Sequence, residues 1–278
     1  MSDRLSYLLA KKADLERRIL SEDTKTNALK IVCNSTFGKL NDFYSPLRSV
    51  PDALRVTING QLYLLMLIER LAAAGIHTIS ANTDGVTVRA RRDASDVLQG
   101  VVKAWEKDTG FELEAVDYVR VARRDVNAYV AVTDKGKVKT KGAFENPKGD
   151  GRAISKAVVA WLAHRVPIRE TFKTCKPEDF VFYQRCKAGG GGLFLDASEH
   201  LGRLARWVMV PPGTGRSLVR ITAKQTATLP HGESVALTQD LNTIPEPDLD
   251  AYEAEAERII CSTMDPVPRV GPGVRSLL

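Results

Sequence analysis

The sequence has few cysteines and histidines, and neither type is clustered. Cys33, Cys175, Cys186 and Cys261 lie far apart and form no Cys-x-x-Cys pair. Neither a structural zinc site nor a disulfide framework is therefore expected, which fits a reducing cytoplasm. The four histidines form no local group, so a histidine-based metal site has no support.

Long apolar runs are also lacking. No stretch approaches the roughly 20 apolar residues that a membrane-spanning helix needs, and the charged N-terminal segment has no apolar core of the signal-peptide kind. We therefore expect no membrane partner and a cytoplasmic location. The net charge of +6 favours contact with phosphate backbones, although many soluble proteins are mildly basic.

The N-terminal residues carry apolar side chains at helical spacing. This pattern predicts one helix over residues 4–20 and a second over 24–37, with a turn at 21–23. Helices joined so tightly form an antiparallel pair, and Gly38 is expected to end the second helix. Turn formers and two prolines then predict a loop over 39–57.

The middle of the chain alternates helical and β-rich segments. A helix is predicted over 61–74 and another over 95–107. Strands are predicted over 76–81, 86–90, 111–122, 126–133 and 137–144. This order indicates an α+β domain with an antiparallel sheet and helices on one face.

The remainder is predicted to be a mixed region. Gly149 to Gly151 marks a boundary, and helices are expected over 153–165 and 249–260, with short strands between them and a frayed end. The glycine run 189–192 indicates either a linker, the interpretation we favour, or a segment in close backbone contact, with DNA as the alternative to a linker.

Three groups of residues suggest chemistry. The first is Lys30, Asn34 and Phe37, which share one helix face just before Gly38. A lysine there can hold a triphosphate, and an aromatic ring one turn later can abut a base or sugar. Taken alone, the same spacing fits an ordinary amphipathic helix with an exposed lysine.

The second group is the segment Ala-Asn-Thr-Asp-Gly at 81–85, which places Asp84 at a hairpin tip. A carboxylate there is exposed and suits Mg²⁺, which is held by one or two carboxylates together with substrate phosphates. Asp-Gly is also simply a favourable hairpin turn.

The third group is the basic strand Lys139, Thr140, Lys141 and Gly142, with Arg120, Arg123 and Arg124 upstream. Such a ribbon can follow a phosphate backbone. Lysines also protect ordinary edge strands from aggregation, so this group has a structural explanation as well.

Together and in this order, the three segments resemble the family B DNA polymerases. TNALKIVCNSTFGKL resembles motif B (KxxxNSxYG), SANTDGVTV resembles motif C (DTD), and VKTKG resembles the KxKG strand that grips the primer–template duplex. The likeness extends over about residues 5–145 and is looser beyond 150, where it is nearest to phage-encoded polymerases. It implies a fingers helix pair over 1–40, a palm over 41–150 and a thumb-like region over 151–278. For a phage protein, the location would be the host cytoplasm.

The resemblance also implies roles for individual residues. Lys30 would be catalytic and bind the phosphates of the incoming dNTP, and Asn34, Phe37 and Gly38 would line the nucleotide pocket. Asp84 would be a catalytic ligand of two Mg²⁺ ions. Contacts to the duplex near the primer end would come from Tyr129, Lys139, Lys141 and Gly142.

The sequence departs from the family pattern at several positions. Asn82 stands where motif C usually has its first aspartate, and Phe37 replaces a tyrosine. The basic run that usually precedes Tyr129 is absent, and Arg123 and Arg124 are candidates to compensate for it.

The largest departure is that motif A, which carries the other catalytic aspartate, and the exonuclease domain are absent. We expect the chain alone to be inactive or nearly so. It would be part of a split polymerase or a truncated product, with an open sheet edge and a tightly bound partner chain that supplies motif A and possibly the exonuclease. The alternatives are a non-catalytic module that binds primer–template DNA and an unrelated basic α+β protein.

Overall fold

The computed structural model describes residues 2–145, 151–187, 190–240, 243–264 and 274–277. Two compact units divide the chain, residues 1–66 and 67–278. The predicted boundary near residue 150 does not separate compact units, because one hydrophobic core includes residues on both sides of it, such as Val130 and Val158.

The helices are α1 (Ser2–Asn41), α2 (Val50–Ala73), α3 (Ser95–Thr109), α4 (Arg152–His164), α5 (Ile168–Thr174) and α6 (Leu249–Met264). The short 3₁₀ turns are η1 (Arg92–Ala94), η2 (Gly142–Phe144) and η3 (Pro177–Phe180).

Thirteen strands are assigned within the described residues. In the first sheet these are β1 (His77–Asn82), β2 (Gly85–Arg89), β3 (Ala115–Asp125), β4 (Ala128–Thr133), β5 (Val138–Lys141) and β13 (Val274–Leu277). The others are β6 (Phe182–Arg185), β7 (Gly192–Leu195), β8 (Glu199–Gly202), β9 (Leu204–Met209), β10 (Leu218–Ile221), β11 (Thr226–Thr228) and β12 (Val235–Leu237).

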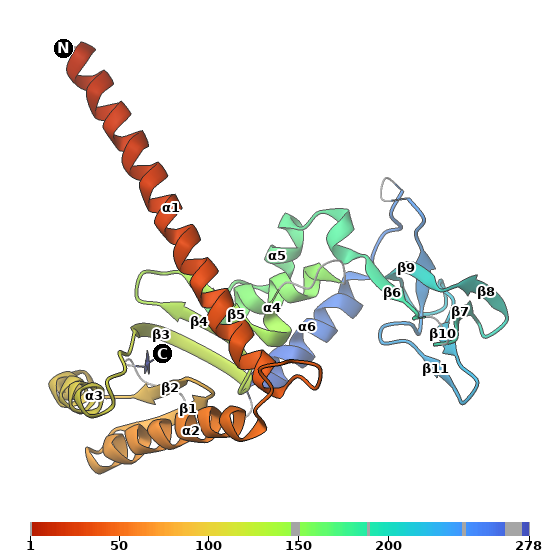
Figure 1. Ribbon diagram of the computed structural model, residues 1–278. Coiled ribbons are helices and arrows are strands. Elements are labelled where there is room, and N and C mark those ends of the chain that lie inside the picture. Colours follow the sequence, from red (N-terminus) through yellow and green to blue (C-terminus); the bar gives the residue numbers. More distant parts are fainter. Residues whose placement is uncertain (1, 146–150, 188–189, 241–242, 265–273, 278) are drawn as a thin grey trace. The chain divides into compact units, whose positions relative to one another are not determined.

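The predicted α+β class with antiparallel sheets is confirmed. The six-stranded sheet has the order β1-β2-β13-β3-β4-β5, and every pairing in it is antiparallel. Two smaller sheets have the orders β11-β10-β7-β8 and β12-β9-β6. Figure 1 shows their labelled strands, β6 to β11, grouped together at the right of the view.

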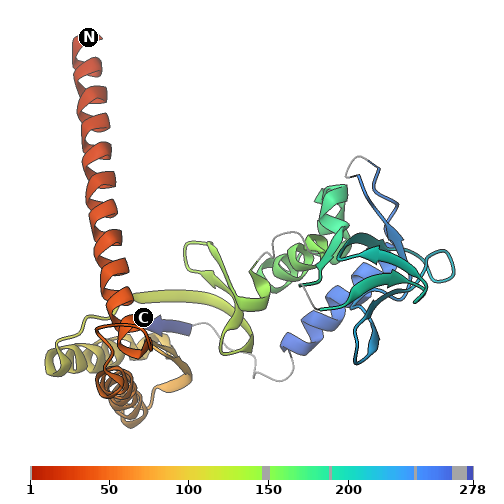
Figure 2. The ribbon, with the colours of Figure 1, turned by 45° about the vertical axis from the view of Figure 1, so that its right-hand side comes forward.

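The predicted antiparallel pair of N-terminal helices is wrong. A single helix of 40 residues, α1, runs through the expected turn at 21–23, and Figure 2 shows it without a break. The turn contains no glycine or proline, and Lys25 forms an ion pair of 2.7 Å with Glu22 along the helix. Gly38 does not end the helix, which continues to Asn41.

The loop predicted over 39–57 is correct only for residues 42–49, because α1 continues to Asn41 and α2 begins at Val50. Helix α2 begins at Val50 and therefore includes Pro51 in its first turn. Proline is tolerated there because the first N–H groups of a helix have no partner within the helix. The carbonyl of Ser49 accepts the N–H of Ala53 at 3.0 Å, which starts the hydrogen-bonding pattern of α2.

The main core of the 67–278 unit joins the first sheet to the C-terminal elements. Its residues include Ala122, Val130 and Val132 of the sheet and Leu162 of α4. An aromatic group continues it, in which the Phe182 ring lies 5.8 Å from Trp207 and 5.7 Å from Tyr252. Strands β3 and β4 therefore share one hydrophobic core with the C-terminal elements.

The glycine run is in close backbone contact, so our favoured interpretation as a linker is wrong for Gly190 to Gly192. The carbonyl of Gly190 accepts two N–H groups of Arg220, at 2.9 and 2.7 Å. Gly191 has φ +84°, and a Cβ there would lie 2.1 Å from the Ile221 carbonyl oxygen. Only glycine fits this position.

A buried ion-pair group stabilises the junction between α4 and η3. Asp179 is 2% exposed, and its carboxylate accepts Lys156 Nζ at 2.5 Å and the Lys176 N–H at 3.0 Å. Arg152 Nε lies 3.3 Å from the other carboxylate oxygen. Burial alone would raise the pKa of Asp179, but these partners together outweigh burial and lower it.

We predict that Asp179→Asn lowers the free energy of unfolding by about 2 kcal/mol near neutral pH, because it leaves two cations without their carboxylate. A lowered native pKa contributes stability above the unfolded-state pKa and loses it as the pH falls through the native value. The loss should therefore shrink below about pH 4. Urea unfolding across pH measures both effects, and exposed Asp134→Asn is the control. An equal loss at every pH would contradict this explanation.

Candidate nucleic-acid interface and metal ligand

The β1–β2 hairpin presents Asp84 at its tip, as predicted. Asn82 pairs with Gly85, so Thr83 and Asp84 are the two turn residues and Gly85 begins β2. Thr83 has φ +47°, and the Asp84 N–H donates to the Asn82 carbonyl at 2.6 Å. All three residues from Asn82 to Asp84 are exposed, so the carboxylate of Asp84 is accessible to a ligand.

Asn82 is held by the turn between β3 and β4. Its Nδ2 donates to Oδ1 of Asn127 at 2.8 Å, and its Oδ1 accepts the Thr83 hydroxyl at 3.1 Å. The Asn127 N–H in turn donates to Oδ1 of Asp125 at 2.9 Å. The Asn82 amide is therefore fixed in orientation by hydrogen bonds.

The β3–β4 turn also explains why residue 142 is a glycine. This glycine follows β5 with φ +61°, and a Cβ there would lie 2.2 Å from the Asn127 carbonyl oxygen. The backbone of the Lys139–Gly142 segment thus passes directly against the residue whose side chain holds Asn82. Two of the three predicted groups are thereby linked through Asn127.

The carboxylate of Asp125 belongs to this turn as well. Its pKa is lowered, first by the hydrogen bond from the Asn127 N–H and further by the Arg124 guanidinium. Arg124 Nε lies 3.3 Å from Asp125 Oδ2. The hydrogen bond from Asn127 and the contact with Arg124 hold the Asp125 carboxylate in the turn.

Antiparallel register places the basic residues of the sheet in rows across β3, β4 and β5. Arg123 pairs with Tyr129, which pairs with Lys141, and in the next row Ala131 pairs with Lys139. Since side chains on paired residues point to the same face, these residues share one face. We call Arg123, Tyr129, Lys139 and Lys141, together with Tyr118, the basic face.

Aromatic rings support the cations of the basic face. Lys139 Nζ lies 5.7 Å from the centroid of the buried Tyr118 ring, within cation–π range. Arg123 is half-buried, and burial lowers its pKa, while Asp125 and Tyr129 act in the opposite direction. Partly desolvated cations beside aromatic rings form a surface suited to phosphates and bases.

Strand β5 is an edge of the six-stranded sheet. The alternative explanation, that Lys139 and Lys141 protect this edge from pairing with another chain, is therefore consistent with the structure. Edge protection accounts for lysines in β5. It does not account for the alignment of Arg123 on β3 and Tyr129 on β4 with them.

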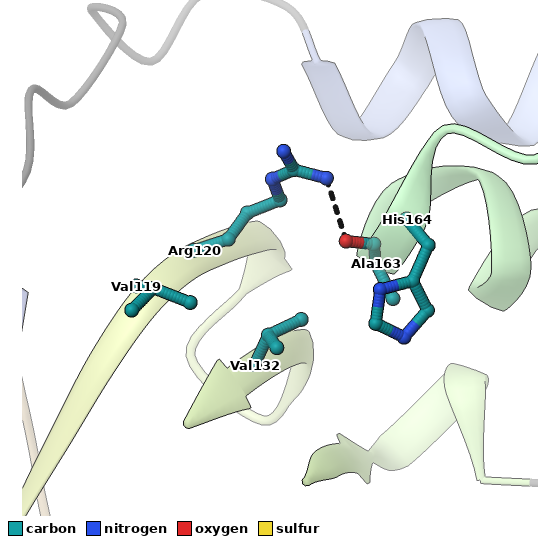
Figure 3. A pocket seen from close by; sticks show the side chains of 5 residues that line it. All are labelled: Val119, Arg120, Val132, Ala163 and His164. Carbon is teal, nitrogen blue, oxygen red and sulfur yellow. Dashed lines mark hydrogen bonds between the residues drawn. The ribbon is translucent and has the colours of Figure 1, made fainter. Parts of the chain in front are cut away.

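The opposite face of these strands is packed against helices. Arg120 and Val132 form a row there, and Ala122 and Val130 form the next. A small pocket of about 300 Å³ is lined by Val119, Arg120, Val132, Ala163 and His164. Figure 3 shows the Arg120 guanidinium donating to the Ala163 carbonyl, at 2.6 Å, near the end of α4. Arg120 thus caps a helix and is not part of the basic face.

The residues predicted to bind nucleotide lie in the other unit. Lys30, Asn34 and Phe37 are exposed on α1, with Phe37 44% exposed. Because the helix is continuous, they share one face as predicted. Gly38 has no neighbouring atom within 4 Å of the position its Cβ would take. The structure describes the two units separately, so it does not bring this face and Asp84 into one site.

Sequence reasoning missed Tyr118 and Asn127. Tyr118 could have been found from its alternation with Val116 along β3. Asn127 carries no such signal, because its partner Asn82 is 45 residues away.

A scan of the sequence against protein-family models gives no match, and a search of curated proteins also finds none. Among the described residues, no group of three or more His, Cys, Asp or Glu side chains is placed to hold a metal ion. No helix in the described part of the chain is long and apolar enough to span a membrane.

We predict that Gly142→Ala is more destabilising than Gly136→Ala. Both glycines flank β5 and have positive φ, but the Gly136 site has nothing within 4 Å. Both substitutions share the backbone penalty, and only Gly142→Ala must displace Asn127, which should add about 1–3 kcal/mol. Urea unfolding measures the difference, and amide shifts of Asn82 report the displacement. Equal losses would show that the contact with Asn127 is relaxed in solution.

Proposed function

We propose that this chain is the C-terminal part of a family B DNA-directed DNA polymerase. The observation that carries the proposal is the link between two motif-like segments. The hairpin bearing Asp84 and the segment Lys139–Gly142 both meet Asn127, through the Asn82 side chain and the Gly142 backbone. Primer extension requires metal-binding carboxylates close to groups that hold the phosphate backbone, and Asp84 and the Lys139–Gly142 segment are candidates for one of each.

In this proposal the reaction is the attack of a primer 3′-hydroxyl on the α-phosphate of a dNTP, with pyrophosphate as the leaving group. Asp84 is an accessible hard-oxygen ligand and fits one arm of a Mg²⁺ site. Bound Mg²⁺ ions would activate the hydroxyl and stabilise the leaving oxygens. Asn82 offers a neutral oxygen that also accepts the Thr83 hydroxyl.

The residues of the basic face would hold the duplex. Lys139, Lys141 and Arg123 supply positive charge for phosphate oxygens, and Tyr129 presents an aromatic surface between them. Lys30 on α1 would bind the triphosphate as a point charge, and Asn34, Phe37 and Gly38 would form the pocket beside it. These are positioning and electrostatic roles, which dominate phosphoryl transfer.

A partner chain would complete the site, because Asp84 is one carboxylate and the motif A aspartate is absent. Large apolar side chains exposed in the 1–66 unit support this part of the proposal. On α1 these are Leu29, Ile31 and Val32, and on α2 they include Leu54, Val56, Ile58 and Leu62, at 48–65% exposure. Large exposed apolar side chains are typical of surfaces that contact other proteins.

A non-catalytic DNA-binding module is the second candidate. This candidate is favoured by Asn82, because its amide is uncharged and already forms hydrogen bonds with Asn127 and Thr83. Under this alternative the basic face binds primed DNA and Asp84 is only a turn residue.

Primer extension separates the two candidates. The assay uses a primed template, dNTPs and Mg²⁺, with the chain alone and with a supplied chain that carries motif A. We expect extension only with the second chain, and its loss in Asp84→Asn with DNA affinity unchanged. Asp84→Asn keeps the size and removes the charge, so the turn should persist. DNA binding without synthesis in any combination would favour the binding module.

For the basic face we predict that Lys141→Ala and Arg123→Ala each weaken binding of primed DNA. Each should reduce the slope of log affinity against log salt by about 0.9, as expected for the loss of one phosphate contact. Exposed Lys103→Ala on α3 is the matched control and should leave the slope unchanged. Fluorescence anisotropy over a salt series measures the slopes. A uniform effect of all three variants would indicate non-specific attraction to the net charge.

A further inference from the structure

Strands β2 and β3 lie on either side of a segment from a distant part of the sequence. Strand β13 (Val274–Leu277) is antiparallel to both and is drawn in dark blue beside the C-terminal label in Figure 2. Val274 is in register with Arg89 and Tyr118, and Leu277 with Val86 and Ala115. The open sheet edge expected from the sequence is therefore filled by the chain itself.

Removal of β13 would leave two unpaired edges at the centre of the sheet. Strand β4 pairs with β3 only from Tyr118 onward, so Ala115 and Val116 have β13 as their single paired neighbour among the described strands. The Asp117 carbonyl also accepts the Asp134 N–H at 3.1 Å. On the other side, β2 has β1 as its second partner. We define the slot as the facing edges of β2 over 86–89 and of β3 over 115–118. Unpaired backbone groups on both edges favour occupation by an extended chain.

The segment that fills the slot is short and contains a charged residue. It is only four residues long, and an arginine, Arg275, is in register with Val88, which is fully buried at 0% exposure. Central strands are normally apolar opposite a buried residue. The backbone pairing that β13 makes with β2 and β3 is of a kind that any extended segment can make.

We propose that the slot is the docking site for a β-strand of a partner chain, and that β13 occupies it until that strand displaces it. The occupant is an extended segment that runs in the direction of β13, with apolar residues in register with Val86 and Val88. Only the identity of this partner, the chain that supplies the second carboxylate, rests on the proposed function.

The register also places that carboxylate. Leu277 is in register with Val86, two residues after Asp84. A strand in the same direction that extends one or two residues beyond this point comes beside the Asp84 turn. A carboxylate that follows the strand would therefore face Asp84, whereas a carboxylate at the start of the strand would lie at its far end, near Arg89.

Disulfide trapping in the full chain tests the place of β13. Thr87 and Ser276 are in register, and antiparallel partners lie about 4.5–5.5 Å apart at Cα, within reach of a disulfide. We expect Thr87→Cys with Ser276→Cys to form the bond on mild oxidation, mapped by peptide mass. Thr87→Cys with Arg275→Cys is the matched control. These two positions are one residue out of register, so no disulfide bond should form between them. Equal yields, or no bond in either, would overturn the assignment.

Hydrogen exchange tests whether β13 protects the slot. Ser276→Pro removes a backbone N–H and disfavours a central strand. Ser276→Thr is the control, because threonine keeps the N–H and is favourable in strands. We expect exchange over 85–89 and 115–118 to become at least about tenfold faster in Ser276→Pro alone. Amides of β4 and β5 should be unaffected, which also shows that the fold persists. Unchanged exchange in the slot would overturn the proposal.

Exchange of strands is tested in trans with a synthetic peptide of residues 273–278 at millimolar concentration. It should restore slow exchange over 85–89 and 115–118 in Ser276→Pro and have no effect on the disulfide-locked chain. A slot that stays open would show that it does not accept a strand from another molecule.

None of these measurements uses DNA, dNTP or Mg²⁺. If these results are obtained but no primer is ever extended, the docking slot is supported and the proposed function is not. If these results are not obtained but a primer is extended with a second chain, the proposed function is supported and the docking slot is not.

Discussion

Antiparallel pairing of β3 with β4 and of β4 with β5 is the constraint on which the 67–278 unit depends. It sorts side chains by parity into two populations. Ala122, Val130 and Val132 enter the core beneath α4, while Arg123, Tyr129 and Lys141 share the other face. A slip of one residue would exchange the two populations, burying cations and exposing valines. Core stability and surface charge are therefore specified by the same hydrogen bonds.

Much of this unit could be predicted from the sequence because its signals are local. The strands predicted over 126–133 and 137–144 and the helix predicted over 95–107 correspond to β4, β5 and α3 within a few residues. Asp84 at a hairpin tip followed from the same patterns. The basic residues of β5 were visible as a group, but their alignment with Arg123 required the register, which no single segment contains.

The predictions were wrong where a short stretch of sequence is compatible with two different conformations. The stretch at 21–23 suits a turn or a helix, and without glycine or proline the helix continues. Pro51 was taken for a loop residue but stands in the first turn of α2, where proline is acceptable. The glycine run owes its conformation to Ile221, some 30 residues away. Contacts of that kind, like Asn82 with Asn127, are properties of the fold rather than of a segment.

Strand β3 pairs with different strands at its two ends. Its first four residues pair with β13, and from Tyr118 onward it pairs with β4. A register irregularity between Tyr118 and Arg120 separates the two stretches. Such a bulge interrupts the ladder and adds local twist, so the two stretches can open as separate cooperative units. In the proposed exchange of β13, the half of the sheet that carries the positive charge would therefore remain ordered while the half beside the β1–β2 hairpin changes its neighbour.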